Sequence, residues 1–516
     1  MSDNIECVLP IEELSALKKV GRVGSSSDDD QSTVIGDISH DEDELDERIR
    51  ELKDLVEVEN QQTTTLAQDQ GNRPPPKIQK VPFVLGDRKK FEKYYEPRVV
   101  SVGPIHHGKP NLRVAERYKL KLAAAFIKQS GKETRALYKM ISNKIDQLKD
   151  YYHEDEHKKY DDKTLSRILF LDGCAVLQFI HDFYHGKLNE FMIKTDHIAF
   201  TQHDLFLLEN QIPFEVLRLL MDLSEFRSKL KKSMGSFIRR NIMAPLDYTE
   251  KLSIDMDNLD FIPIHLLDLL QHVSVLNNNN NNNNNKNKKK EQIGSRSVAE
   301  IDQQQQQQQQ QQKKKKKKKK KKEQDGSGDN LSFRNVQELK AAGIDLKLSK
   351  TCSLADITFN SSFFTGWLNL PPMIVDDSTK PKFLNLIAYE SCPDNFRTNY
   401  EVTSYISFLD SLIDHANDVK ELRRPKILRN LLGSDEEVAS LFNEIATDLV
   451  PNLELYKDVK SKIQKHYDNK WRTWMAEAYH DHFSSPWTIL AFIAALVGLT
   501  LSGIQTWYGV FSPSHP

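Results

Sequence analysis

Residues 487–511 read WTILAFIAALVGLTLSGIQTWYGVF, a run of 25 residues without a charged side chain. A helix needs about 20 mainly apolar residues to cross the hydrocarbon core of a bilayer. Aromatic residues stand at both ends of the run, as in the interfacial belt of membrane helices, and small residues recur along it. The run therefore predicts a transmembrane helix over 487–511. A buried core helix is the other interpretation, and so long an uncharged stretch disfavours it.

The charges beside this run predict its orientation. Cationic residues precede the run and none follows it: Lys462, Lys465, Lys470 and Arg472. Because cytoplasmic flanks carry the excess of Lys and Arg, we expect the N-terminal side to be cytoplasmic. The first residues lack the apolar core of a signal peptide, so a single-pass, tail-anchored protein of the plasma membrane or endoplasmic reticulum is expected. In that compartment all four cysteines should be free thiols: Cys7, Cys174, Cys352 and Cys392.

Composition separates a folded body from a basic insert. The chain has 516 residues, a mean hydropathy of −0.58 and 28% charged residues, which is typical of a largely soluble protein with room for two or three domains. Residues 277–330 hold 14 Lys and 1 Arg against 6 acidic residues. The formal net charge of −2 is thus the sum of +9 here and −11 elsewhere. An acidic body gives no support for a nucleic-acid partner.

Low-complexity sequence marks the expected domain boundaries. Residues 1–76 are predicted to be disordered, with one short amphipathic or coiled-coil helix around Leu45 to Val56. The Asn, Gln and Lys homopolymers of 277–330 predict a solvated linker. Its Lys run could contact anionic lipid, although a passive linker is the favoured interpretation. Residues 77–276 and 331–483 then form the two halves of the folded domain, ahead of the membrane helix.

Hydrophobic periodicity predicts a mainly α fold: a multi-helix soluble body with a minor β element and one C-terminal transmembrane helix. In the first half we expect helices over 112–129, 132–152, 163–184, 204–223 with a break at Pro213, and 264–273. The helix over 163–184 is apolar nearly all round, which predicts a central position. In the second half we expect strands at 344–348 and 355–359, an edge piece at 368–375, and helices over 402–413, 438–449 and 453–467.

Three sequence features invite a catalytic interpretation, each with a simpler alternative. The HEDEH sequence from His153 to His157 matches the zinc-protease pattern HExxH, but its charged surroundings favour a plain helix end. The His106-His107 loop could act with Cys174 or Asp204 as nucleophile and base, although a cysteine on an apolar helix is usually a core residue.

The third feature is the polar run of residues 209–211 (ENQ) ahead of Pro213. These side chains are expected to satisfy backbone groups that the break leaves free. The sequence has no P-loop, GxSxG, GxGxxG or CxxC motif. We therefore expect no catalytic, cofactor-binding or metal-binding residues, no cofactor, and a protein that is not an enzyme.

Several stretches together resemble one family, the plant proteins that share the domain of unknown function numbered 247. The matching pieces are 81–82, 99–108 (VVSVGPIHHG), 116–120 (ERYKL), 172–174 (DGC), 204–214, 339–348, 385–390 (NLIAYE), 433–439 (GSDEEVA), 471–474, 486–487 and the hydrophobic run. The long N-terminal region, the homopolymer insert and residues 363–377 depart from the family pattern. The resemblance implies one C-terminal membrane helix and no established activity; some members are associated with self-incompatibility in grasses.

Two functional hypotheses follow. The preferred one is a membrane-anchored interaction, scaffold or signalling component at the cytoplasmic face. Its expected partners are the lipid bilayer, through 487–511, and proteins of unknown identity. The alternative is a membrane-tethered enzyme that uses the His106-His107 loop with Cys174 or Asp204.

Overall fold

The computed structural model describes residues 75–82, 93–259, 261–276, 335–362, 365–468 and 486–511. The short helix expected near Leu45 and the insert over 277–330 lie outside these ranges. Within them the protein is mainly helical with a small amount of β structure, which confirms the expectation of a mainly α body with a minor β element.

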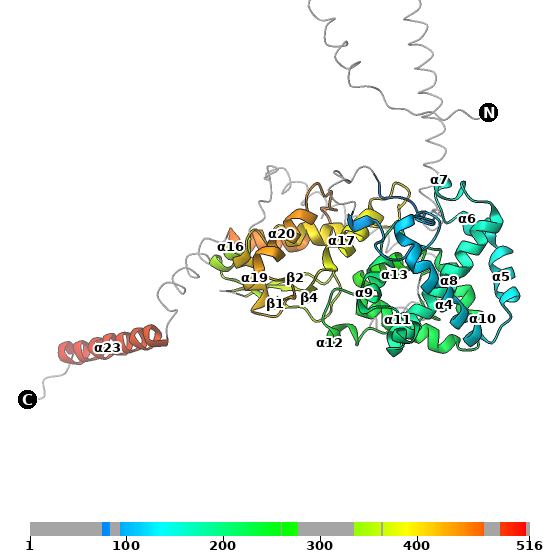
Figure 1. The fold of residues 1–516 in the computed structure, drawn as a ribbon. Helices are drawn as coiled ribbons and strands as arrows, with labels where there is room; N and C mark the ends of the chain where they lie inside the picture. Colours follow the sequence, from blue (N-terminus) through cyan, green and yellow to red (C-terminus); the bar gives the residue numbers. More distant parts are fainter. Residues whose placement is uncertain are drawn as a thin grey trace, which may run out of the picture. The chain divides into compact units, whose positions relative to one another are not determined.

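Helix α8, Asp162–His185, is the centre of the first half. It packs against α4 (Arg113–Ser130), α5 (Thr134–Ser142), α10 (Phe214–Leu223) and α11 (Arg227–Asn241) (Figure 1). The Asp161 carboxylate caps the start of α8 by accepting the Thr164 N–H. Its middle is buried on all sides, as its sequence predicts. The other helices of this half are η2 (Pro110–Leu112), α6 (Ile145–Lys149), α7 (Glu154–His157), η3 (Leu188–Phe191), α9 (Thr195–Asp204), α12 (Leu246–Thr249) and α13 (Leu266–Val275).

A glycine lets α8 and α10 approach closely. A Cβ atom at Gly173 would lie 2.8 Å from both Leu220 Cδ1 and Val216 Cγ1 of α10. That is closer than carbon atoms approach in a packed core. Gly173 therefore has a packing role between these two helices.

The described part of the second half, up to residue 468, combines two small sheets with six helices. In the three-stranded sheet β3 (Gly366–Leu370) lies between β1 (Ile344–Leu348), to which it is parallel, and β2 (Thr358–Ser361), to which it is antiparallel. Strands β4 (Met373–Val375) and β5 (Leu428–Asn430) form a parallel pair. The helices are α16 (Val336–Ala341), α17 (Thr379–Glu390), α18 (Glu401–Asp410), α19 (Ala416–Arg423), α20 (Asp435–Ile445) and α21 (Lys457–Tyr467), with short α16 preceding the sheet.

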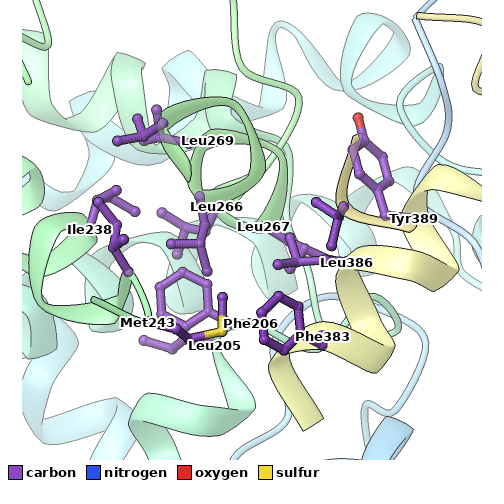
Figure 2. Packing of buried hydrophobic residues seen from close by; sticks show 14 of the residues in the cluster. Leu205, Phe206, Ile238, Met243, Leu266, Leu267, Leu269, Phe383, Leu386 and Tyr389 are labelled. Carbon is purple, nitrogen blue, oxygen red and sulfur yellow. The ribbon is translucent and has the colours of Figure 1, made fainter. Parts of the chain in front are cut away.

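The two halves share one hydrophobic core. Phe383 and Leu386 of α17 lie on one side of this cluster, Leu266 and Leu267 of α13 on the other, with Phe206 below Leu266 (Figure 2). All five side chains are almost fully buried. Neither half buries these side chains alone, so the expected division at the insert separates two parts of one folding unit.

Asn385 adds polar contacts between the halves. Its Oδ1 atom accepts the Leu208 N–H at 2.8 Å, and its Nδ2 atom donates to the Tyr94 carbonyl at 2.8 Å. The residue is completely buried in α17. A buried amide that pairs with backbone groups of two distant segments fixes their relative positions.

Four sequence-based expectations need correction. The helix expected over 132–152 is two helices, α5 and α6, because Lys144 leaves the helical conformation (φ −107°, ψ 11°). Helix α9 ends already at Asp204, so the helix expected over 204–223 consists only of α10, which does begin after Pro213. The strand expected at 355–359 begins only at Thr358.

The piece expected at the sheet edge is the fourth correction. It contains β3, the central strand, because the two prolines at 371–372 lie after β3 and do not interrupt it.

Two described helices are long and apolar enough to cross a membrane. In α8 most of the apolar stretch is buried inside the protein, which identifies α8 as a core helix. In α23, Pro486–Phe511, none of the stretch over 490–508 is buried. The helix expected over 487–511 is therefore present, and its length and composition permit a membrane span.

Candidate functional site

The segment over residues 98–108 (RVVSVGPIHHG) runs through the core without joining a sheet. Backbone N–H and C=O groups in such a segment need partners, because an unpaired buried polar group is costly. Most of these partners are side chains of residues 204–211 and of α4 and α8, as the next paragraphs describe. This segment contains both candidate histidines.

Asp204 holds the start of the segment. Its Oδ1 atom accepts the Arg98 N–H at 3.0 Å, and its Oδ2 atom accepts the N–H groups of Val99 and Val100 at 2.8 and 3.0 Å. Burial raises the pKa of Asp204 to about 6, against the opposing effect of these three donors. Both carboxylate oxygens are thus occupied by backbone groups, which gives Asp204 a structural role.

Asn210 holds the middle of the segment. Its Oδ1 atom accepts the Val102 N–H at 2.7 Å, and its Nδ2 atom donates to the carbonyls of Val100 and Asp204. The side chain thereby replaces a neighbouring strand. As expected, the Asn210 side chain satisfies backbone groups. Most of these groups, however, lie about a hundred residues earlier in the chain and not beside Pro213.

Gln211 and Glu209, the neighbours of Asn210 in the sequence, also bond to backbone groups. Gln211 donates to the carbonyls of Leu205 and Leu207, just before the break, as expected. Glu209 instead accepts the Val81 N–H at 2.9 Å. The polar run over 209–211 therefore connects three parts of the chain.

A buried ion pair closes the other side of the segment. Lys119 Nζ of α4 lies 2.5 Å from Asp172 Oδ1 of α8, 2.9 Å from Glu116 Oε1 and 2.8 Å from the Ser101 carbonyl. Asp172 Oδ2 accepts the Gly103 N–H at 2.8 Å. Burial lowers the pKa of Lys119, but the carboxylates of Asp172 and Glu116 outweigh it and raise that pKa above its ordinary value. Lys119 is therefore charged, and its three protons all have acceptors.

The two histidines lie in different surroundings. His106 is buried, with its Nε2 atom 3.1 Å from Glu209 Oε2, which is also buried. His107 is partly exposed, and its ring lies edge-on to Tyr160 at 6.1 Å between centroids. The two residues therefore do not act as one pair of ligands or bases.

A cavity of about 170 Å³ lies beside His107, between α4 and α8. Its lining residues are His107, Glu116, Lys119, Leu120, Arg167, Ile168, Leu171 and Asp172. Neither Cys174 nor Asp204 is among them. The structure thus gives His107 a cavity, but it does not bring the other two candidates into it.

Cys174 lies one residue beyond Gly173 in the core of α8 and is fully buried. Burial raises the pKa of its thiol, which disfavours the thiolate that a nucleophile needs. Cys352 and Cys392 are also buried free thiols. These observations agree with a core role for Cys174.

The HExxH match lies on α7, a single helical turn. His153 precedes the helix and is half exposed, and His157 is its last residue. In the described parts of the chain no group of three or more His, Cys, Asp and Glu residues is placed to hold a metal ion.

Sequence reasoning missed the charged lining of the cavity. Glu116 and Leu120 of α4, and Arg167 and Leu171 of α8, lie four residues apart and line the cavity together with Lys119 and Asp172. The charged residues Arg167 and Asp172 on the predicted central helix were a signal that could have indicated this cavity.

The 98–108 segment and its hydrogen-bond partners lie within a region that matches a known protein family. The family described as plant protein of unknown function, DUF247, matches residues 78–501, and the chain belongs to it. The UPF0481 protein At3g47200 of Arabidopsis thaliana is 28% identical, covering 81% of this chain and 83% of its own. A second UPF0481 protein of that plant, At3g02645, is 23% identical, covering 81% and 87%. No solved structure matches the chain.

Replacing Gly103 by Ala tests how tightly the 98–108 segment is held. Gly103 has φ +77°, and a Cβ atom there would lie 2.4 Å from the Gln211 carbonyl oxygen. Gly108 has φ +84° with nothing within 4 Å, so it is the matched control. We expect Gly108→Ala to lower the free energy of unfolding by about 1–2 kcal/mol through backbone strain alone, and Gly103→Ala to lower it clearly more.

Urea unfolding of the full chain in detergent, followed by circular dichroism, measures both values. Equal losses for the two variants would show that the carbonyl of Gln211 moves away at no cost.

Thiol labelling tests the candidate nucleophile. In a Cys7→Ser background, we expect iodoacetamide at pH 8 to modify Cys174 at least about a hundredfold more slowly than a cysteine in a short peptide, because access requires opening of the core. Mass spectrometry of the digested protein reads each thiol, and labelling in urea is the control. Rapid modification of native Cys174, with Cys392 protected, would favour the enzyme hypothesis.

Proposed function

We propose that this protein is a membrane-anchored interaction protein, with its helical body at the cytoplasmic face, and that it is not an enzyme. The observation that carries the proposal is the apolar helix α23. Its 26 residues span about 39 Å, more than the roughly 30 Å of a bilayer core. An exposed apolar helix of this length is strongly unfavourable in water, and a bilayer removes that cost.

Charge supports the orientation. Lys462 and Lys465 lie on α21, and Lys470 and Arg472 follow in the sequence before α23. Residues 512–516 contain neither Lys nor Arg. This asymmetry favours a cytoplasmic body, at the plasma membrane or the endoplasmic reticulum.

An exposed apolar surface supports a partner protein. The Asn452 N–H donates to the Ser404 hydroxyl and its Nδ2 atom to the Asn399 carbonyl, which places Asn452 beside Asn399 and Ser404. Here Val450 is 79% exposed and Leu453 71% exposed. Grouped apolar side chains on a protein surface often mark interaction sites. We call these residues, with Phe396 and Tyr400, the 396/453 surface.

The enzyme alternative has no comparable support. It requires the His106-His107 loop to act with Cys174 or Asp204. Of these four residues only His107 lines the 170 Å³ cavity, and Asp204 is engaged with backbone donors.

Membrane insertion is tested by synthesis of the full chain with microsomes. We expect the wild type to resist carbonate extraction, and Leu496→Arg with Leu499→Arg to be extracted, because each Arg at a helix centre costs about 2.5–3.5 kcal/mol on insertion. The matched control replaces the same two leucines by Ala. Extraction of the wild type would contradict the anchor.

The same samples report orientation. The acceptor sequence at Asn360, exposed on β2, should stay unglycosylated, and an acceptor added after Pro516 should be modified. The reverse pattern would place the body in the lumen.

Charged substitutions test the 396/453 surface. We expect Val450→Asp with Leu453→Asp to remove about half or more of the proteins that the full chain labels by proximity in cells, because buried charge disrupts an apolar contact. Val114→Asp with Met192→Asp, at exposed apolar positions elsewhere, is the control. The same loss in both variants, or in neither, would contradict a partner at this surface.

A further inference from the structure

The cavity beside His107 is lined by two cationic and two acidic side chains: Lys119, Arg167, Glu116 and Asp172. Its floor holds Lys119 and Asp172, which are buried and paired with each other at 2.5 Å. The Lys119 ammonium group also donates to the Ser101 carbonyl and pairs with the Glu116 carboxylate. The floor is therefore internally satisfied, and a molecule in the cavity has to be recognised by the other lining groups.

Two of those groups have unused hydrogen-bonding capacity. Arg167 of α8 is exposed at the cavity and forms no ion pair or hydrogen bond with another described residue. The Nδ1 atom of His107 is buried yet has no hydrogen-bond partner in the described parts of the chain. A guanidinium with free donors that shares a cavity with an unpaired ring nitrogen suits an oxyanion when that nitrogen carries a proton, and Arg binds carboxylates in a bidentate manner.

The remaining charges do not oppose this assignment. Glu116 is the only lining carboxylate besides Asp172, and its Oε1 atom lies 2.9 Å from Lys119. Lys119 partly offsets both carboxylates, so Arg167 makes the lining neutral overall. An anionic ligand therefore pairs with Arg167, because Lys119, the other cation of the lining, is already paired with Asp172 and Glu116.

The rest of the lining is apolar. Leu120 of α4 and Ile168 and Leu171 of α8 are its apolar lining residues, and the volume is about 170 Å³. A cavity of about 150 Å³ is large enough to hold a benzene ring. The site therefore has room for a small hydrocarbon body as well as for the charged group.

We propose that the cavity between α4 and α8 binds a small organic carboxylate, whose carboxylate pairs with Arg167 and His107 and whose apolar body contacts Leu120, Ile168 and Leu171. The proposal does not depend on the membrane anchor or on the 396/453 surface. It gives the His106-His107 loop a ligand-binding role in place of a catalytic one.

Benzoate is the probe, titrated against the full chain in detergent and followed by saturation-transfer NMR. We expect a Kd of about 1 mM or tighter for the wild type. Benzamide, which has the same shape without the charge, and inorganic phosphate, which has the charge without the ring, should each bind at least about tenfold more weakly.

Variants locate the site. Arg167→Gln should weaken benzoate at least about tenfold, whereas Arg117→Gln, an exposed position of α4 outside the cavity lining, should not. Leu120→Trp should block the mouth, whereas Val114→Trp, also exposed on α4, should leave binding unchanged.

These substitutions are at exposed positions, and circular dichroism confirms that each variant is folded. Three results would each overturn the proposal: no benzoate binding at about 10 mM, equal binding by Arg167→Gln and Arg117→Gln, or phosphate binding as tight as benzoate.

Discussion

The hydrogen bonds that hold residues 98–108 in the core are the constraint on which the first half depends. This segment has no neighbouring strand, so side chains supply the partners of its backbone. Asp204 and Asn210 reach it from one side, and Asp172 reaches it from the other side. Because an unsatisfied buried amide costs about 1–3 kcal/mol, these contacts select one path for the chain. The packing of α4 and α8 and the cavity between them follow from that path.

In the second half, too, a buried side chain satisfies backbone N–H groups. Glu390, at the end of α17, is fully buried and accepts the first free N–H groups of α18, from Val402 and Thr403, at 2.9 and 2.8 Å. It also accepts the Gln271 amide of α13 at 2.8 Å. Burial raises the pKa of Glu390, against the opposing effect of these donors. A single carboxylate thus joins three helices from both halves of the domain.

This pattern changes how the polar motifs of the family are interpreted. Asp204 and Asn210 belong to stretches that invite a catalytic interpretation in the sequence, yet both, like Glu390, are engaged by backbone groups. The functions proposed above rest on groups that do not hold the 98–108 segment. These are the cavity at Arg167, the 396/453 surface and the helix α23.

The sequence alone determined the mainly helical fold, the central buried helix α8 and the apolar helix α23, because each depends on local periodicity over many residues. It also indicated that residues 209–211 satisfy backbone groups. Only the tertiary structure decided which groups they satisfy, that β3 is a central strand, and that Lys119 and Arg167 face one cavity. Contacts between segments that are separate in the chain set these features, and no local spacing encodes them.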